Sequence, residues 1–458
     1  MDYKNVGEGT YGCVIKPAIK CSDKQPEGYE DKQPSTYENK VSKLMHEVDA
    51  EEEFNETTDL LNIDGIEDYA IVKPHLCKPV DNEELGKIIK KCTGQSQLRY
   101  KVGKEYNLNQ ISQLLVEDGG INLHNFPYIL YSDLIPEEKI FFFKSLLNLF
   151  NGLKFFRENN IIHHDIKLPN IVYNIETKTC KYIDFGLVHD RNDLASKMDT
   201  NDDDFSISWG YFPTENECRS KGNFIRSICK NYRNIFKELE LEEIEVQREY
   251  KPSDRQLEQL AYEKLRNWVL DSFDQYCLCL ALHDLCIKLR YREEDRNIKQ
   301  FLQKFEIILF RQCQDHRSPK ALRRFNNKQK EVDKIKDKEP ELSDFSRNQQ
   351  EEFITNLLKE RMRLFDLDEH VIEPYQELLT TLESKSTSSN EKEETKEEVN
   401  QNSTSSQLEM TKADFDRLPS IGLGGGTKKK FPRKKKNKRK TKKQKTKRRK
   451  RTTIRKKK

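Results

Sequence analysis

Two short motifs near the middle of the chain constrain its fold more than any other feature. Residues 161–170 read Ile-Ile-His-His-Asp-Ile-Lys-Leu-Pro-Asn and residues 182–186 read Tyr-Ile-Asp-Phe-Gly, each beside a β-branched or apolar run. Together they supply two carboxylates, an amine and an amide: Asp165, Asp184, Lys167 and Asn170. In metal-assisted phosphoryl transfer a carboxylate orients the attacking hydroxyl, an amide oxygen and a second carboxylate hold Mg²⁺, and a cation lies near the phosphate. The motifs therefore predict two loops, held between strands, that carry this chemistry.

A glycine-rich segment at the amino terminus predicts where a nucleotide binds. Its Gly-x-Gly-x-x-Gly spacing also occurs before a helix in dinucleotide-binding folds. Here the flanking residues 3–6 and 13–19 read as strands, so the glycines belong to a hairpin that lies over the nucleotide. Glycine is needed because the backbone must approach the phosphates closely. The segment consists of Val6, Gly7, Glu8, Gly9, Thr10, Tyr11, Gly12, Cys13 and Val14.

In combination these motifs resemble the eukaryotic-type protein kinase family. The resemblance implies an α+β, two-lobed fold with a small β-rich amino-terminal lobe and a helical carboxy-terminal lobe. It implies ATP and Mg²⁺ as cofactors and a protein substrate. Asp165 would be the catalytic base, Asn170 and Asp184 would hold Mg²⁺, and Lys167, two residues after the base, is typical of relatives that act on serine and threonine.

Residues 41–43, Val-Ser-Lys, match the third strand of the family. Lys43 takes the place of the lysine that holds the α- and β-phosphates of ATP, and Lys40 is the competing candidate. We prefer Lys43 because an apolar residue lies two positions before it and a Leu-Met pair follows it, as in a buried strand.

An acidic run at residues 50–56 matches the helix whose glutamate pairs with that lysine. Glu53 is the first choice, and Glu52 and Glu56 are the alternatives. For any one of these glutamates, an exposed acidic helix face is the competing explanation.

Further along the chain, residues 111–118 read as a strand that resembles the hinge between the lobes, where Val116 and Asp118 would lie beside the adenine. Apolar residues recur at helical spacing over residues 137–159, which predicts one buried helix leading into the catalytic loop. Asp274 resembles the aspartate at the start of a later helix that holds the catalytic-loop backbone.

The segment that follows Asp184 ends at Phe-Pro-Thr-Glu, residues 212–215, a partial match to the Ala-Pro-Glu motif of the family. His164 stands where the family has an arginine that receives a phosphate on this segment. A histidine is mostly neutral at pH 7 and lacks the guanidinium fork. We therefore do not expect activation by such a phosphate, and the alternatives are constitutive activity or a switch operated by a partner.

The domain organisation predicted from these motifs and from composition has four parts. An amino-terminal lobe, residues 1–118, carries a polar surface insertion at residues 20–38. A carboxy-terminal lobe, residues 119–382, carries an insertion near residues 220–260, because the sequence there is longer than the connection requires. Composition then shifts to Ser, Thr, Glu, Lys, Asn and Gln, which predicts a disordered linker at residues 383–426 and a basic tail at residues 427–458.

The positive charge of the basic tail offsets a strongly negative net charge in the rest of the chain. The tail contains 22 Lys or Arg and no Asp or Glu, so residues 1–426 carry a net charge of −18 although the whole chain carries +4. Such a tail attracts polyanions through counterion release, which makes non-specific nucleic acid a candidate partner. Nuclear targeting and an intramolecular contact with the acidic remainder of the chain are the alternatives.

Other features bear on the compartment. No run of 18 apolar residues occurs and the amino terminus enters the fold at once, so we expect neither a membrane span nor a secretory signal. The 11 cysteines show no metal-ligand spacing, and we expect reduced thiols. The Val-Ser-Lys strand, the Gly-Gly after the hinge and the basic ending resemble divergent kinases of large nucleocytoplasmic DNA viruses. That resemblance implies host cytoplasm or virion, and otherwise the chain would be cytoplasmic or nuclear.

Two functions compete with a Ser/Thr protein kinase. A pseudokinase scaffold is disfavoured because degenerate relatives usually lack one equivalent of Lys43, Asp165 or Asp184, and all three are present. A small-molecule phosphotransferase is disfavoured because such relatives generally lack Lys167 and the glycine loop.

Overall fold

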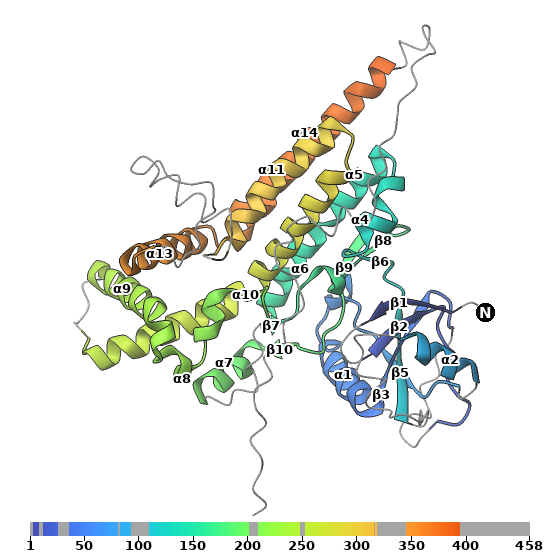
Figure 1. Ribbon diagram of the computed structural model, residues 1–458, viewed down its shortest axis with the longest axis horizontal. Coiled ribbons are helices and arrows are strands. Elements are labelled where there is room, and N and C mark those ends of the chain that lie inside the picture. Colours follow the sequence, from blue (N-terminus) through green and yellow to red (C-terminus); the bar gives the residue numbers. More distant parts are fainter. Residues whose placement is uncertain are drawn as a thin grey trace, which may run out of the picture. The chain divides into compact units, whose positions relative to one another are not determined.

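The computed structural model describes residues 3–8, 12–25, 36–80, 83–92, 110–200, 209–247, 252–315, 317 and 345–393. It begins with a five-stranded antiparallel sheet in the order β1-β2-β3-β5-β4, flanked by helices α1 and α2 (Figure 1). The strands are β1 (Lys4–Glu8), β2 (Gly12–Lys16), β3 (Lys40–His46), β4 (His75–Cys77) and β5 (Ile111–Glu117). The helices are α1 (Glu47–Leu60) and α2 (Glu83–Lys91).

Both faces of this sheet are buried, which explains its apolar strands. Leu44 packs with Ile15 and with the apolar residues of α2 on one face. Met45 packs with Leu114 and with Ala50 of α1 on the other face. Because side chains alternate along a strand, residues 43 and 45 of β3 point toward α1, whereas residues 40, 42 and 44 point away from it.

Gly12 is required by the approach of β2 to β3. A Cβ atom added there would lie 2.3 Å from the carbonyl oxygen of Leu44, a distance that no side chain tolerates. Any larger residue would push the glycine hairpin off the sheet.

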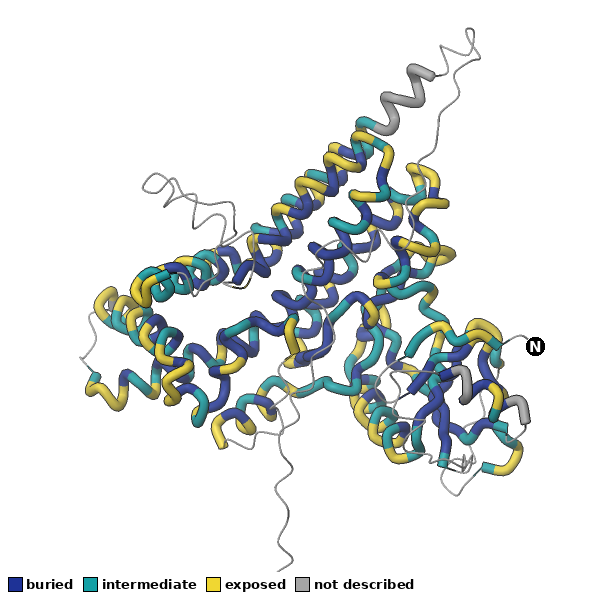
Figure 2. Tube along the Cα trace, in the orientation of Figure 1, coloured by how far each residue is buried: buried dark blue, intermediate teal, exposed yellow. Residues whose placement is uncertain are grey.

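The second lobe is helical around one large apolar core, and Figure 2 shows buried residues along the inner faces of its helices. Two helices precede the catalytic loop, α5 (Pro136–Ser145) and α6 (Leu147–Glu158). The others around this core are α4 (Phe126–Ile129), α10 (Asp254–Arg292), α11 (Arg296–Cys313) and α14 (Glu373–Glu393). Small sheets pair β6 (Ile121–Asn122), β8 (Ile171–Asn174) and β9 (Thr179–Tyr182), and β7 (Ile161–Ile162) with β10 (His189–Asp190).

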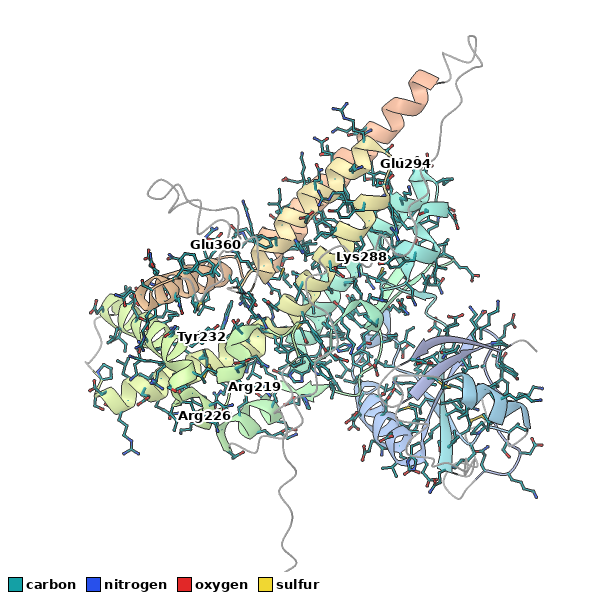
Figure 3. The ribbon with its side chains drawn as sticks, viewed as in Figure 1. Arg219, Arg226, Tyr232, Lys288, Glu294 and Glu360 are labelled. Carbon is teal, nitrogen blue, oxygen red and sulfur yellow. A yellow bond between two sulfur atoms is a disulfide. The ribbon has the colours of Figure 1, made fainter. Side chains whose placement is uncertain are left out.

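A second apolar cluster lies in a separate group of helices that contains the labelled Arg219, Arg226 and Tyr232 (Figure 3). It joins the first half of α10 to three other helices: α8 (Lys221–Phe224), α9 (Lys230–Gln247) and α13 (Arg347–Arg363). Helix α7 (Arg191–Thr200) packs on α10 through a separate small cluster with Ile162 and Leu270. The predicted insertion near residues 220–260 falls within this group. Some of its apolar residues, among them Phe224 and Phe236, are buried in the second cluster, so the segment packs against the rest of the lobe.

The predicted fold class, an α+β two-lobed fold, is confirmed. Three boundaries predicted from sequence are wrong. Residues 137–159 form two helices that meet at Leu146, and the helix containing Asp274 begins 20 residues earlier, at Asp254. The predicted linker at 383–426 begins too early, because α14 continues to Glu393; the rest of the linker and the tail lie outside the described residues.

Three disulfides correct the expectation of reduced thiols for six of the 11 cysteines, whereas the other five are free and buried. Their Cα atoms are 5.6, 5.8 and 5.9 Å apart, within the usual range for a disulfide. Because two of the pairs join residues 79 and 56 apart, only the folded sheet brings them together, and no short spacing in the sequence marks them. The pairs are Cys13–Cys92, Cys21–Cys77 and Cys218–Cys229.

Candidate active site

The catalytic loop brings two of the predicted residues, Lys167 and Asn170, to the carboxylate of a third, Asp165. Asp165 is 7% exposed. Lys167 Nζ lies 3.0 Å from its Oδ1 and 2.7 Å from its Oδ2. Asn170 Nδ2 donates to the Asp165 carbonyl oxygen at 2.9 Å and to Oδ2 at 2.8 Å. Since its amide nitrogen is bound to Asp165, Asn170 is held in one orientation.

A buried aspartate of α10 holds the loop backbone. Asp274 Oδ2 accepts from the His163 N–H at 2.7 Å and Oδ1 accepts from the His164 N–H at 3.0 Å. Burial raises the pKa of the Asp274 carboxyl, although His163 and the two N–H donors act against this. The position of the loop therefore depends on a residue more than 100 positions away in the sequence.

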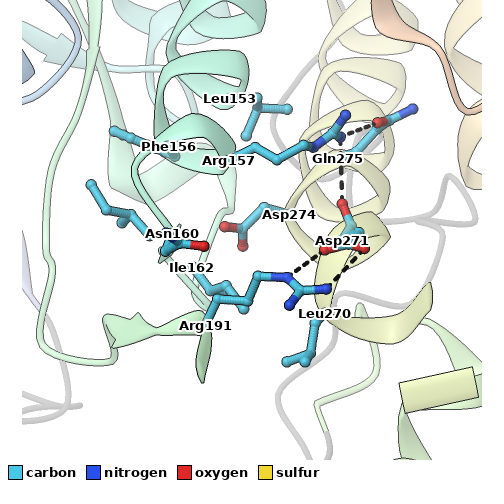
Figure 4. Close-up of a pocket in the computed structure, with 11 residues that line it drawn as sticks. Leu153, Phe156, Arg157, Asn160, Ile162, Arg191, Leu270, Asp271, Asp274 and Gln275 are labelled. Carbon is cyan, nitrogen blue, oxygen red and sulfur yellow. Dashed lines mark hydrogen bonds and ion pairs between the residues drawn. The ribbon is translucent and has the colours of Figure 1, made fainter. Parts of the chain in front are cut away.

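A small pocket behind the loop shows how α10 is tied in place (Figure 4). Arg157 of α6 donates to Gln275 Oε1 at 2.9 Å. Arg191, the first residue of α7, contacts both carboxylate oxygens of Asp271, at 2.6 and 3.1 Å. Asp274 lines the same pocket, so these contacts brace the helix turn that supports the catalytic loop.

The Lys43 side chain contacts carboxylates of both lobes. Its Nζ lies 2.6 and 2.7 Å from the two carboxylate oxygens of Glu53 and 2.8 Å from Asp184 Oδ1. Lys40 has the opposite strand parity and points away from α1, while Glu52 and Glu56 are exposed. Among the candidates, only Lys43 and Glu53 are brought to Asp184.

The charges of this cluster stabilise one another. Burial alone would lower the pKa of Lys43 and raise that of Asp184. The two carboxylates outweigh this effect and raise the pKa of Lys43, and the nearby ammonium lowers the pKa of Asp184 below its usual value. Lys43 is therefore a cation and Asp184 a carboxylate at pH 7.

The structure describes the predicted nucleotide loop in part. Val6, Gly7 and Glu8 end β1, and Gly12, Cys13 and Val14 begin β2, so the two strands form the predicted hairpin. Gly9, Thr10 and Tyr11, at its tip, lie outside the described residues.

At the predicted hinge, Val116 pairs with Val41 within the sheet. The backbone N–H of Asp118 donates to the Asn39 carbonyl at 2.8 Å, and its carboxylate forms an ion pair with Lys16. The backbone N–H of Asp118 therefore already has a partner.

His164 is buried against aromatic rings. Its ring centroid lies 4.6 Å from that of Phe273, 5.4 Å from that of Phe212 and 5.5 Å from that of His189. Burial, assisted by His189 and Arg219, lowers the pKa of His164 well below its ordinary value. The ring is neutral at pH 7.

His189 predicts a specific pH dependence of stability. Burial, together with Lys197 and Arg219, lowers its pKa to about 4. The unfolded chain therefore takes up a proton near pH 6.5, and the folded chain does so only near pH 4. Stability should fall as pH is lowered through this window, by about 1 kcal/mol from this residue after allowing for its partial exposure.

The measurement is the thermal midpoint at pH 7 and pH 5 for the wild type and for His189→Gln. The drop between the two pH values should be smaller in the variant by roughly 2–4 °C. An equal drop in both proteins would assign the effect to other groups.

Two contacts at this site were not predicted from the sequence. The Tyr211 hydroxyl donates to Asp165 Oδ1. Arg361 of α13 forms an ion pair of 2.8 Å with Glu215, both of them buried. The Phe-Pro-Thr-Glu motif singled out Glu215. Tyr211 and Arg361 were not singled out, because each lies far in the sequence from the residue that it contacts.

Comparison with known proteins adds two findings. Residues 2–224 match the family model described as protein tyrosine and serine/threonine kinase. A stretch of 76 residues is 43% identical to the membrane-associated tyrosine- and threonine-specific cdc2-inhibitory kinase of Drosophila melanogaster, and it covers 17% of this chain and 14% of that relative. The similarity thus spans a small part of the relative. Among the described residues, none of the helices has the length and apolar character needed to cross a membrane.

Proposed function

We propose that the protein kinase domain of this chain is catalytically active and transfers the γ-phosphate of ATP to serine and threonine hydroxyls of proteins. The observation that carries the proposal is the contact of Lys43 with both Glu53 and Asp184, next to an intact Asp165 loop. These contacts support a single site in which the groups proposed to bind ATP and the group proposed to receive the acceptor proton would act together.

Each residue has a role that follows from its chemistry. Lys43, held by Glu53, would bind the α- and β-phosphates as a cation, and the hairpin at residues 6–14 would cover the triphosphate. Asp165 would orient the acceptor hydroxyl and take its proton, and Lys167 would bind the transferred phosphate. Val116 and Asp118 would lie beside the adenine.

Asn170 and Asp184 would hold Mg²⁺, which neutralises charge on the phosphates when it is bound. The donor set fits, because hard oxygen ligands are what this ion prefers. Asp184 is kept ionised by Lys43, and the bonds of the Asn170 amide nitrogen to Asp165 set the orientation of its oxygen.

The acceptor class is the finer part of the proposal. Lys167 favours serine and threonine, whereas the Drosophila relative is described as tyrosine- and threonine-specific. The test is Mg²⁺-dependent transfer of labelled phosphate to protein or peptide substrates, followed by phosphoamino-acid analysis. Phosphoserine and phosphothreonine are expected in the substrate. Phosphotyrosine as the main product would overturn the acceptor assignment, and ATP binding without any transfer would favour the pseudokinase.

The register of β3 gives a sharp test of the donor site. Lys43→Met should lower kcat by at least about a hundredfold, because the ion-paired cation that holds the phosphates is lost. Lys40→Met is the matched control, since it changes the same residue type on the same strand but on the opposite face, and it should stay within about threefold of the wild type. Equal losses in both variants would contradict this assignment.

We also propose that residues 427–458 bind nucleic acid without sequence preference. Deleting them should abolish retention on DNA or RNA at low salt, and the binding of the full chain should weaken steeply with salt because each neutralised phosphate releases close to one counterion. Peptide phosphorylation should stay unchanged. A change in peptide turnover would instead indicate an intramolecular contact, and loss of nuclear import alone would indicate targeting.

The proposed origin is a large nucleocytoplasmic DNA virus, on the basis of the sequence resemblance alone. The chain would then act in the host cytoplasm or the virion, and detection of its peptides in purified particles by mass spectrometry would support this. In a cellular source, cytoplasm or nucleus is the proposed location.

A further inference from the structure

A short loop between α8 and α9 exposes two large apolar side chains. Ile225 is 63% exposed and Ile228 is 70% exposed. Residues 225–228, here called the isoleucine loop, are all exposed, whereas Phe224 before them and Cys229 after them are buried. A single exposed apolar residue is ordinary on a protein surface. Two isoleucines on one loop instead form an apolar tip that no described part of the chain covers.

The isoleucine loop is held from both ends. Cys229 forms a disulfide with Cys218, and the ring of Phe224 lies 5.5 Å from the ring of Tyr262 in the second apolar cluster. Arg233 of α9 donates to the Phe224 carbonyl oxygen at 2.8 Å. Because both anchors point into this cluster, the loop is braced in the conformation that turns its isoleucines outward.

Positive charge surrounds the isoleucine loop. Residues 218–237 contain six Lys or Arg and no Asp or Glu, although residues 1–426 carry a net charge of −18. Lys221, Arg226 and Lys230 are exposed, and none of their side chains has an acidic partner among the described residues. Figure 3 shows Arg226 at the outer edge of this helix group. Three unpaired cations thus lie beside the apolar tip.

Neighbouring elements do not neutralise this charge. Two carboxylates on helices packed nearby have partners of their own, because Glu258 pairs with Arg233 and Asp199 pairs with Arg266. Lys230 is the first residue of α9, and the first turn of that helix contains no acidic residue. The helix dipole therefore adds to the positive charge here, and an anionic partner would be stabilised.

A bilayer surface fits this arrangement better than a protein partner or a nucleic acid does. Stable protein interfaces cover about 800 Å² of each partner and are enriched in aromatic residues. The isoleucine loop is only four residues long, and the nearby aromatic residues Phe224, Tyr232 and Phe236 are buried. Nucleic acid would use the cations but not the isoleucines. An interfacial anchor needs both, namely apolar side chains at the acyl boundary and cations at the level of anionic headgroups.

From these observations we propose that the isoleucine loop inserts into the surface of anionic lipid bilayers. Ile225 and Ile228 enter the boundary between headgroups and acyl chains, and the guanidinium of Arg226 extends back to the headgroup phosphates. Lys221 and Lys230 contact anionic headgroups. The contact holds the protein at a membrane surface and involves no catalytic step. The inference is therefore independent of the proposed function.

The first measurement is co-sedimentation of the full chain with vesicles of phosphatidylcholine, alone or mixed with phosphatidylserine. The wild type should bind the mixed vesicles, and the variant Ile225→Ser/Ile228→Ser should bind them at least about tenfold more weakly, because its apolar contact is lost. The basic tail is present in both proteins, so the difference between them reports the loop. Ile307→Ser is the matched control, because Ile307 is 51% exposed on α11 outside this helix group, and binding should change by less than about twofold.

A second measurement detects insertion directly. Ile228→Trp places a tryptophan on the loop, and on addition of the mixed vesicles its emission should shift to shorter wavelength. Phospholipids with brominated acyl chains should quench it. The wild type measures the background from Trp209 and Trp268, and residues 427–458 contain no tryptophan, so the tail cannot produce the signal. Ile307→Trp should show neither the shift nor the quenching.

The outcomes separate insertion from simple attraction of charges. Equal binding by the wild type and the isoleucine variant would overturn the proposal, as would a tryptophan at position 228 that brominated lipids do not quench. If Arg226→Gln/Lys230→Gln weakened binding while the isoleucine variant did not, the surface would be assigned to an acidic protein or a nucleic acid instead.

Kinase activity provides a separate readout. The isoleucine variant should phosphorylate a soluble peptide at the wild-type rate, which shows that weaker vesicle binding does not come from a folding defect. Absence of phosphoryl transfer by the wild type would contradict the proposed function, and vesicle binding would still test this inference.

Discussion

Replacing Asp165 by asparagine should reduce kcat for peptide phosphorylation by about 10² to 10⁴, the usual range for loss of a general base. Asparagine has the same shape, so the loop should keep its fold. However, it cannot accept the hydroxyl proton, and it loses the ion pair with Lys167 Nζ at 2.7 Å. Because Lys43 and Asp184 are untouched, the affinity for Mg²⁺ and ATP should change by no more than about threefold.

Steady-state kinetics and nucleotide titration measure the two effects separately. Asp133→Asn provides the matched control, since it makes the same change at an exposed position outside the catalytic loop, and it should leave kcat unaltered. Retention of more than about a tenth of the wild-type kcat in Asp165→Asn would assign the base to another group. Lost nucleotide affinity would instead indicate that the substitution disturbs the whole site.

The second large effect concerns stability. Arg361 and Glu215 are 4% and 1% exposed, and their ion pair measures 2.8 Å. Arg361→Met should destabilise the fold by about 3–5 kcal/mol, because it leaves the Glu215 carboxylate buried without its cation. Arg361 also lies over the rings of Tyr276 and Trp268, and methionine retains part of that apolar packing.

This effect should appear as a fall of about 10 °C in the thermal midpoint. The double variant Arg361→Met with Glu215→Gln should recover part of the loss, because no unpaired charge remains. Arg363→Met, two residues later on the same helix and 62% exposed, should change the midpoint by less than about 2 °C. An equally small change in Arg361→Met would show that the buried pair contributes little.

Site residues that belong to short motifs with fixed spacing could be predicted from the sequence. The spacing of Asp165, Asn170 and Asp184 follows from the geometry of two short loops, so the order of residue types carries the information. The choice of Lys43 over Lys40 could also be argued locally, because strand parity decides which side chain faces α1. The fold class followed from the motifs and the apolar patterns around them.

Contacts across long sequence separations could not be predicted in this way. The three disulfides, the pairing of Arg361 with Glu215, and the hydroxyl of Tyr211 on Asp165 each depend on which elements the core brings together. Asp274 differs from these, because the resemblance of its motif predicted that it holds the loop backbone, and its carboxylate does accept from the N–H groups of His163 and His164. The sequence by itself determined which chemical groups are available and their order within each loop, because the backbone holds residues a few positions apart close to one another. The tertiary structure decided their partners, because burial of apolar surface fixes the positions of whole helices and strands, and their side chains meet as a result.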